Sequence, residues 1–128
     1  LDVLKVERID HGVQSLKDPR LVEGLVAERM PLTVCPLSNI KLCVFPELAA
    51  HNLKTMLDRG MVATINSDDP AYFGGYINQN FAQTFAALPL DANDAIVLAR
   101  NSFEASFASP EQKRAHGERL DAFMASFG

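Results

Sequence analysis

The fold is decided by the stretch at residues 61–70, which reads MVATINSDDP. Its first five residues are apolar or β-branched and predict a short strand. The remaining five form a polar cluster that contains two adjacent carboxylates, Asp68 and Asp69. A buried strand that ends in such a cluster is typical of an α/β protein, because the chemistry of these proteins lies at the carboxyl ends of parallel strands.

Two similar units precede this stretch. Residues 7–12, ERIDHG, predict a strand that runs into a loop at Gly12. Residues 32–35, LTVC, predict a strand that is apolar on both faces, which suits a parallel strand covered on both sides. Residues 36–39, PLSN, follow it and are interpreted as a loop. Each of the three strands ends in polar residues, so we expect the three clusters to converge on one site.

Helices are predicted between the strands. Asp18 as the N-cap and Pro19 at the first helical position begin one helix, and Pro31 ends it. Pro46 begins a second, and Gly60 ends it at the C-cap. The expected buried faces are Leu21, Val22, Leu25 and Val26 for the first helix, and Ala49, Leu53, Met56 and Leu57 for the second.

Beyond the third strand the pattern becomes helical. Asp91 caps a helix whose predicted buried face is spaced at i, i+3, i+7 and i+11. Residues 109–112, SPEQ, form a capping box that opens a last helix. The expected buried faces are Ile96, Ala99, Phe103 and Phe107 for the first of these helices, and Leu120, Phe123, Met124 and Phe127 for the last.

The strand spacing indicates a barrel. The strands begin near residues 7, 32 and 61, at intervals of 25 and 29 residues. A (β/α)₈ barrel uses about 31 residues for each strand–helix unit and at least about 200 in total. Three strands cannot close a barrel, and both edges of so small a sheet would leave unpaired backbone groups. We therefore expect an α/β fold that forms part of a barrel.

The composition limits the classes of function. The 128 residues carry 12 Lys and Arg against 16 Asp and Glu, and the net charge of −4 excludes a strongly basic nucleic-acid surface. No apolar run approaches the roughly 20 residues that cross a bilayer, and the first residues have no signal-peptide core. We expect a cytoplasmic protein with no nucleic-acid or membrane partner, in which Cys35 and Cys43 are reduced thiols.

Asp68 and Asp69 are the first candidates for chemistry. Carboxylates just past a buried strand are costly to desolvate unless they are paired, hydrogen-bonded or bound to a metal. The alternative is a turn, because Asp-Pro pairs start turns and a free Asp often caps a helix. For the dipeptide alone, the turn is the commoner outcome.

His11 is the second candidate. A lone histidine at a strand end is more often a packed structural residue, but with Asp68 it could share a metal or a proton-transfer path. His51 and His116 fall in predicted helices at positions that face solvent or the helix flanks. We do not expect them to be ligands, because the helices of a barrel pack outside, away from the active mouth.

Two further segments have both a functional and a structural interpretation. Ser38 and Asn39 either donate hydrogen bonds to a ligand or satisfy their own loop backbone. Gly74 and Gly75 suggest a flexible loop above a pocket, and no phosphate-binding glycine motif is present. The Cys35-Pro36 pair also lacks the P-C-x-x-C pattern of the zinc deaminases that act on cytosine.

The three strand-end motifs together resemble one family. RIDHG at residues 8–12, CPLSN at 35–39 and NSDDP at 66–70 resemble the adenosine/adenine deaminase family of metal-dependent amidohydrolases, which have a (β/α)₈ barrel. The resemblance covers essentially all 128 residues. The extensions IKLCV at 40–44 and AYFGGY at 71–76 resemble the bacterial and fungal adenine deaminase branch.

The resemblance implies a role for each candidate residue. Asp68 would be the carboxylate ligand of a catalytic zinc, with one zinc in each full-length chain. Asp69 would hydrogen-bond the purine at N7. His11 would lie beside the water that the zinc activates, orient it and stabilise the hydroxide that attacks C6. The implied reaction is hydrolysis of adenine to hypoxanthine and ammonia, and adenosine deamination is the alternative.

The family also uses residues that this sequence lacks. It needs a His-x-His pair, a third histidine ligand and a glutamate that delivers a proton, and none of these has a candidate here. Residues 1–128 are therefore expected to be the carboxyl-terminal part of a single barrel domain: its last three strand–helix units plus terminal helices, with the amino-terminal half absent.

We expect this part alone to be inactive. The expected partner is a small-molecule purine, and association into a homo-oligomer is left open. An alternative from another class is a non-catalytic half-barrel module that associates through its exposed strand edges.

Overall fold

The computed structural model describes residues 3–126 and contains a parallel sheet of three strands in the order β1-β2-β3. The strands are β1 (Ile9–Asp10), β2 (Leu32–Val34) and β3 (Ala63–Ile65), each within a predicted stretch. Thr33 is the central register position, opposite Asp10 on one side and Thr64 on the other. Strands consecutive in the chain are neighbours in the sheet, and helices connect them, as in a barrel.

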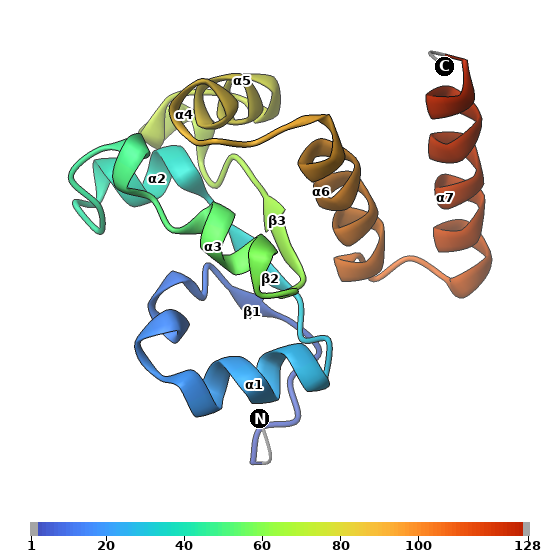
Figure 1. Ribbon diagram of the computed structural model, residues 1–128, viewed down its shortest axis with the longest axis horizontal. Helices are drawn as coiled ribbons and strands as arrows, with labels where there is room; N and C mark the ends of the chain where they lie inside the picture. The colour runs from blue at the N-terminus through green and yellow to red at the C-terminus, as the bar shows by residue number, and fades with distance from the viewer. Residues whose placement is uncertain (1–2, 127–128) are drawn as a thin grey trace.

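Helices lie around the small sheet (Figure 1). Between the strands lie the 3₁₀ helix η1 (Val13–Lys17), α1 (Pro19–Ala27), α2 (Pro36–Lys41), the 3₁₀ helix η2 (Leu48–Ala50) and α3 (Leu53–Asp58). After β3 come α4 (Pro70–Phe73), α5 (Ile77–Ala87), α6 (Ala92–Ala105) and α7 (Pro110–Ala125). Helix α6 packs on β3, and α7 lies beyond α6 on the side away from the sheet. None of the helices in residues 3–126 is long and apolar enough to cross a membrane.

The core lies between the sheet and these helices. Leu32 and Val34 of β2 are fully buried and belong to one core cluster with side chains of α1, α3 and α6. The other face of the same strand is polar, because the hydroxyl of Thr33 donates to Asp10 Oδ1 at 2.8 Å. The prediction that residues 32–35 are apolar on both faces is therefore wrong. The alternation assigns one face of the sheet to packing and the other to polar groups.

The N-caps of three helices were predicted correctly, whereas the C-cap of α3 is Arg59 and not the predicted Gly60. The Asp18 side chain accepts from the amides of Arg20 and Leu21, and α1 begins at Pro19. Asp91 and Ser109 each form a capping box at the start of their helices. These signals depend on residues within one helical turn, which is why the sequence alone reveals them.

Residues 36–39 are not the predicted loop. They begin α2, with Pro36 at the first helical position, and the amide of Leu37 donates to Asn80 Oδ1 of α5 at 3.3 Å. The predicted helix from Pro46 to Gly60 is divided into η2 and α3. The division lies at His51, whose ring accepts the Leu53 amide.

Helix α6 presents a different face from the predicted one. Its buried residues are Leu98, Asn101 and Ala105, and Asn101 Nδ2 donates to the Ala63 carbonyl of β3 at 2.8 Å. Phe103 instead stacks on His116 of α7. Phe107 lies beyond the end of α6, and the guanidinium carbon of Arg8 lies over its ring, 4.3 Å from the ring centre. The predicted buried face of this helix therefore includes two residues that contact α7 and Arg8 rather than the core.

Two other expectations about the last helices need correction. Helix α5 was not predicted, although its residues Phe81 and Phe85 pack against the core. Helix α7 buries none of its described residues, and Phe123 is 58% exposed. Phe127, which was expected on the apolar side of α7, lies outside the described residues.

Candidate metal and substrate site

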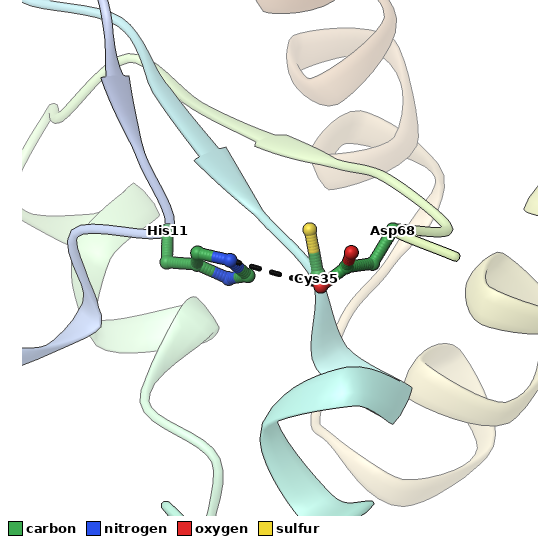
Figure 2. Close-up of side chains that lie close together, drawn as sticks. All are labelled: His11, Cys35 and Asp68. Carbon is green, nitrogen blue, oxygen red and sulfur yellow. Dashed lines mark ion pairs between the residues drawn. The ribbon is translucent and has the colours of Figure 1, made fainter. Parts of the chain in front are cut away.

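A polar cavity of about 440 Å³ opens at the carboxyl ends of the strands. It is lined by Arg8, Asp10, His11, Thr33, Cys35, Asn66, Ser67, Asp68 and Ile77. Figure 2 shows His11, Cys35 and Asp68 brought together from β1, β2 and the segment after β3. The expected convergence of the three strand ends is thus observed for these residues.

His11 and Asp68 face each other across the cavity. His11 Nε2 lies 3.7 Å from Asp68 Oδ2. Both residues adopt left-handed backbone conformations, with φ of 58° and 56°. Such values are uncommon outside glycine, and backbone strain of this kind is often kept where a side chain must be aimed. The amide of His11 also donates to the Thr33 carbonyl at 3.0 Å, which fixes the residue at the strand end.

Ser38 holds the carboxylate of Asp68. The Ser38 hydroxyl is fully buried and donates to Asp68 Oδ2 at 2.7 Å. Within residues 3–126, the side-chain hydrogen bonds and ion pairs of Asp68 use Oδ2, and Oδ1 has none. Asp68 therefore has one oxygen positioned by the protein and one available to a ligand. The loop-backbone alternative for Ser38 is wrong, because its partner is this carboxylate.

Cys35 completes the group that could bind a metal. In the described part of the chain, one set of ligand atoms clusters in this way: those of His11, Cys35 and Asp68, all within 4.8 Å of one another. Burial, and then the charges of Asp68 and Asp10, raise the pKa of the Cys35 thiol to about 12. The thiol donates to the Thr33 carbonyl at 3.4 Å and is neutral at neutral pH when no metal is bound, so it is a poor nucleophile.

A buried chain of hydrogen bonds supports His11 from behind. Asn39 Nδ2 lies 3.4 Å from His11 Nδ1, and Asn39 Oδ1 lies 3.0 Å from His51 Nε2. The amide of Leu53 donates to His51 Nδ1 at 3.1 Å. His51 is 4% exposed and packs against the ring of Phe45 with centroids 4.5 Å apart. Burial lowers the pKa of His51 to about 4.

The expectation for His51 was therefore wrong. It lies between η2 and α3 rather than inside a helix, and it is buried rather than facing solvent. Its partner Asn39 was expected to donate to a ligand or to satisfy its own loop backbone, and its side chain instead lies between His11 and His51. The spacing of 12 residues between them carries no recognisable local signal, so only the folded chain reveals the contact. His116 is exposed on α7, as predicted.

Asp69 caps a helix, which was the structural alternative to a role in chemistry. Its Oδ1 accepts from the amides of Ala71 and Tyr72 and caps α4. Asp69 is exposed and is not among the residues that line the 440 Å³ cavity. The structure thus shows the cap and leaves the second carboxylate oxygen of Asp69 for a further partner.

The two glycines of the loop differ: Gly75 is packed against Leu37, whereas Gly74 is exposed and a Cβ there would meet nothing within 4 Å. Gly75 has φ of +83°, and a Cβ there would lie 2.4 Å from Leu37 Cδ1. Asn80 Nδ2 donates to the Gly75 carbonyl at 3.0 Å. The positive φ and the close approach explain the glycine at position 75, and the flexibility of the loop stays a prediction.

The family model for adenosine deaminase matches residues 1–123. The chain belongs to the adenosine deaminase family. Among curated members, the chain is 64% identical to the adenine deaminase of Albidiferax ferrireducens, over 99% of this chain and 37% of that protein. It is 62% identical to the adenine deaminase of Geotalea uraniireducens, over 99% of this chain and 36% of that protein. The chain thus spans a little over a third of the length of these family members.

Solved structures agree on the fold. The crystal structure of adenine deaminase from Arthrobacter aurescens matches with a TM-score of 0.93 and 46% identity, over 98% of this chain and 38% of that one. An amidohydrolase from Burkholderia ambifaria with bound Zn matches with a TM-score of 0.83 and 20% identity, over 98% of this chain and 36% of that one. The second likeness concerns the fold alone. The expected α/β fold, part of a (β/α)₈ barrel, is confirmed.

Proposed function

We propose that this chain is the carboxyl-terminal part of an adenine deaminase, a single barrel domain that hydrolyses adenine to hypoxanthine and ammonia. The observation that carries the proposal is the meeting of His11 and Asp68 at the carboxyl ends of parallel strands, beside a polar cavity of about 440 Å³. Cavities of this size hold small molecules. The curated relatives at 64% and 62% identity are named adenine deaminase, which favours the free base as the substrate.

The residues at the site fit one part of a zinc centre. Asp68 would hold the ion through the oxygen that Ser38 leaves available. Asp68 alone is fewer than the three protein ligands that a catalytic zinc needs. The family resemblance implies that three histidines and a proton-donating glutamate would come from residues outside this chain. When bound, the metal would lower the pKa of a water to about 7 and make a nucleophile available at neutral pH.

His11 and Asp69 would orient the reactants. The Nε2 atom of His11 points to Asp68, so it would lie beside the attacking water and direct it at C6 of the purine. Asp69 would bind the ring at N7 through the oxygen that does not cap α4, with one proton shared between the carboxyl group and the ring nitrogen. The capping bonds hold Asp69 in place for this contact.

The test is a comparison of two substrates on the complete protein that contains this chain. Hydrolysis at C6 changes the ultraviolet absorbance of the purine, so adenine and adenosine are assayed in the same way. We expect adenine to be consumed and adenosine to be left unchanged. Consumption of adenosine alone would assign the protein to nucleoside deamination, and inactivity on both would overturn the proposal.

A second candidate is an association module. An apolar cavity of about 470 Å³ lies beside β1, with Leu21 and Leu42 among its lining residues at 40% and 54% exposed. The 128-residue chain by itself leaves this surface and the outer edge of β1 to water. We expect the isolated chain to be inactive and to associate with itself. A monomeric mass in solution would contradict this candidate.

A further inference from the structure

The hydrogen bonds behind His11 have a direction that one backbone group determines. The amide of Leu53 can only donate, so His51 Nδ1 must carry a lone pair. The ring is neutral because burial lowers its pKa to about 4. The proton of His51 is therefore on Nε2, which faces Asn39 at 3.0 Å.

The same reasoning passes through Asn39 to His11. Because His51 Nε2 donates, the Asn39 atom that faces it must be the carbonyl oxygen. The amide nitrogen of Asn39 is then directed at His11 Nδ1, 3.4 Å away. A side-chain amide nitrogen can only donate, so His11 Nδ1 accepts, and the proton of neutral His11 lies on Nε2, which faces Asp68.

We propose that His51 is a positioning residue: acting through Asn39, it holds His11 in the tautomer with the proton on Nε2, aimed at Asp68 and the cavity. The proposed tautomer rests on these hydrogen bonds and on the burial of His51, and its meaning for catalysis rests on the proposed function. In that reaction neutral His11 would orient the attacking water by donating a hydrogen bond to its oxygen, rather than by accepting its proton.

Burial makes this arrangement difficult to reverse. His51 and Asn39 are 4% and 2% exposed, so neither side chain can exchange its partner for bulk water. Flipping the Asn39 amide would place an amide N–H against the N–H of His51 and an oxygen against the lone pair of His11. Donor would then face donor at His51 and acceptor would face acceptor at His11, and the unbonded donors at His51 are buried, which is costly.

The test reads the tautomer directly by NMR of the complete protein labelled with ¹⁵N-histidine. Protonated and unprotonated ring nitrogens have well-separated ¹⁵N shifts, and His11→Gln identifies the His11 signals by their loss. In the wild type we expect an unprotonated Nδ1 and a protonated Nε2. A proton on Nδ1 of neutral His11 would overturn the proposal, whatever the activity of the protein.

Three variants test the path through Asn39. His51→Phe keeps a ring against Phe45 and removes both hydrogen bonds, so His11 should become a mixture of tautomers. His51→Gln can donate to Asn39 and accept from Leu53, and should restore most of the wild-type pattern. Asn39→Asp presents an acceptor to both rings, so at about pH 8 the proton should move to His11 Nδ1. Asn39→Asp hardly changes the size of the side chain, which keeps the test decisive if His51→Phe fails to fold.

The matched control is His116→Phe on the exposed surface of α7, which should leave the His11 signals unchanged. An unaltered tautomer in both His51→Phe and Asn39→Asp would refute the path. With adenine as the substrate, His51→Phe should lower kcat by about 10- to 100-fold with little change in KM, and His51→Gln should recover most of it. A protein that is inactive on adenine would overturn the proposed function and leave the tautomer result standing.

Discussion

The two faces of the sheet have opposite characters although they belong to the same three strands. Toward the helices, Leu32, Val34 and Ala63 are fully buried in apolar contacts. Toward the cavity, Thr33 bonds to Asp10, and Cys35 lies within reach of Asp68. Because strand side chains alternate, one face is available for stability while the other supplies chemistry. Mutations on the two faces should therefore affect different measurements.

The largest expected effect is on the cavity face. Asp68→Ala removes the carboxylate that Ser38 orients, and with it the proposed metal ligand. In the complete protein we expect the variant to lose its zinc and its activity on adenine while remaining folded. Metal content by atomic spectroscopy, alongside circular dichroism, checks this. A variant that retains a full complement of zinc would disprove the ligand role of Asp68.

The next largest effect is a difference in the free energy of unfolding between variants of the two faces. Leu32→Ala leaves a void in the core and should lower the free energy of unfolding by about 2 to 5 kcal/mol. Thr33→Ala, its neighbour on the cavity face, loses one half-exposed hydrogen bond and should cost only about 1 kcal/mol. Urea denaturation of the complete protein measures both. Equal losses would mean that the faces do not differ as described.

His51 is bonded to Asn39 on the side of His11 and to the amide of the core residue Leu53. It should make the stability of the protein depend on pH. Its pKa is about 4 in the folded chain against an ordinary 6.5, so below pH 6.5 the unfolded state binds more protons. The contribution of neutral His51 is full above pH 6.5 and is lost as the pH falls toward 4, up to about 3 kcal/mol.

Unfolding experiments between pH 7 and 4 check this dependence. The wild type should lose stability over the range, and His51→Gln, which cannot titrate, should lose about 3 kcal/mol less than the wild type. Parallel curves for the two proteins would rule out His51 as the source.

The smallest effect is at the docking of α6. Asn101→Ala removes the bond to the Ala63 carbonyl and should cost about 1 to 2 kcal/mol. Ser102→Ala, on the exposed side of the same helix, should stay within about 0.5 kcal/mol of the wild type. If the two variants have the same midpoint of thermal unfolding, the Asn101 bond contributes nothing to the docking of α6.

A structural feature could be predicted from the sequence when the residues that determine it are neighbours in the chain. The caps at Asp18 and Ser109, and the strands that end beside His11 and Asp68, follow from neighbouring residues. The α6 face and the place of His51 do not, because Asn101 and His51 owe their burial to partners far along the chain. A buried polar residue is predictable only once its partner is known.

The central claim is that these strand ends form one part of an adenine-hydrolysing site, and adenine turnover tests it most directly. Initial rates are measured for the complete zinc-loaded protein and for the 128-residue chain alone, at matched concentrations. We expect turnover by the complete protein and none by the isolated chain. Turnover by the isolated chain, or its absence from the complete zinc-loaded protein, would contradict it.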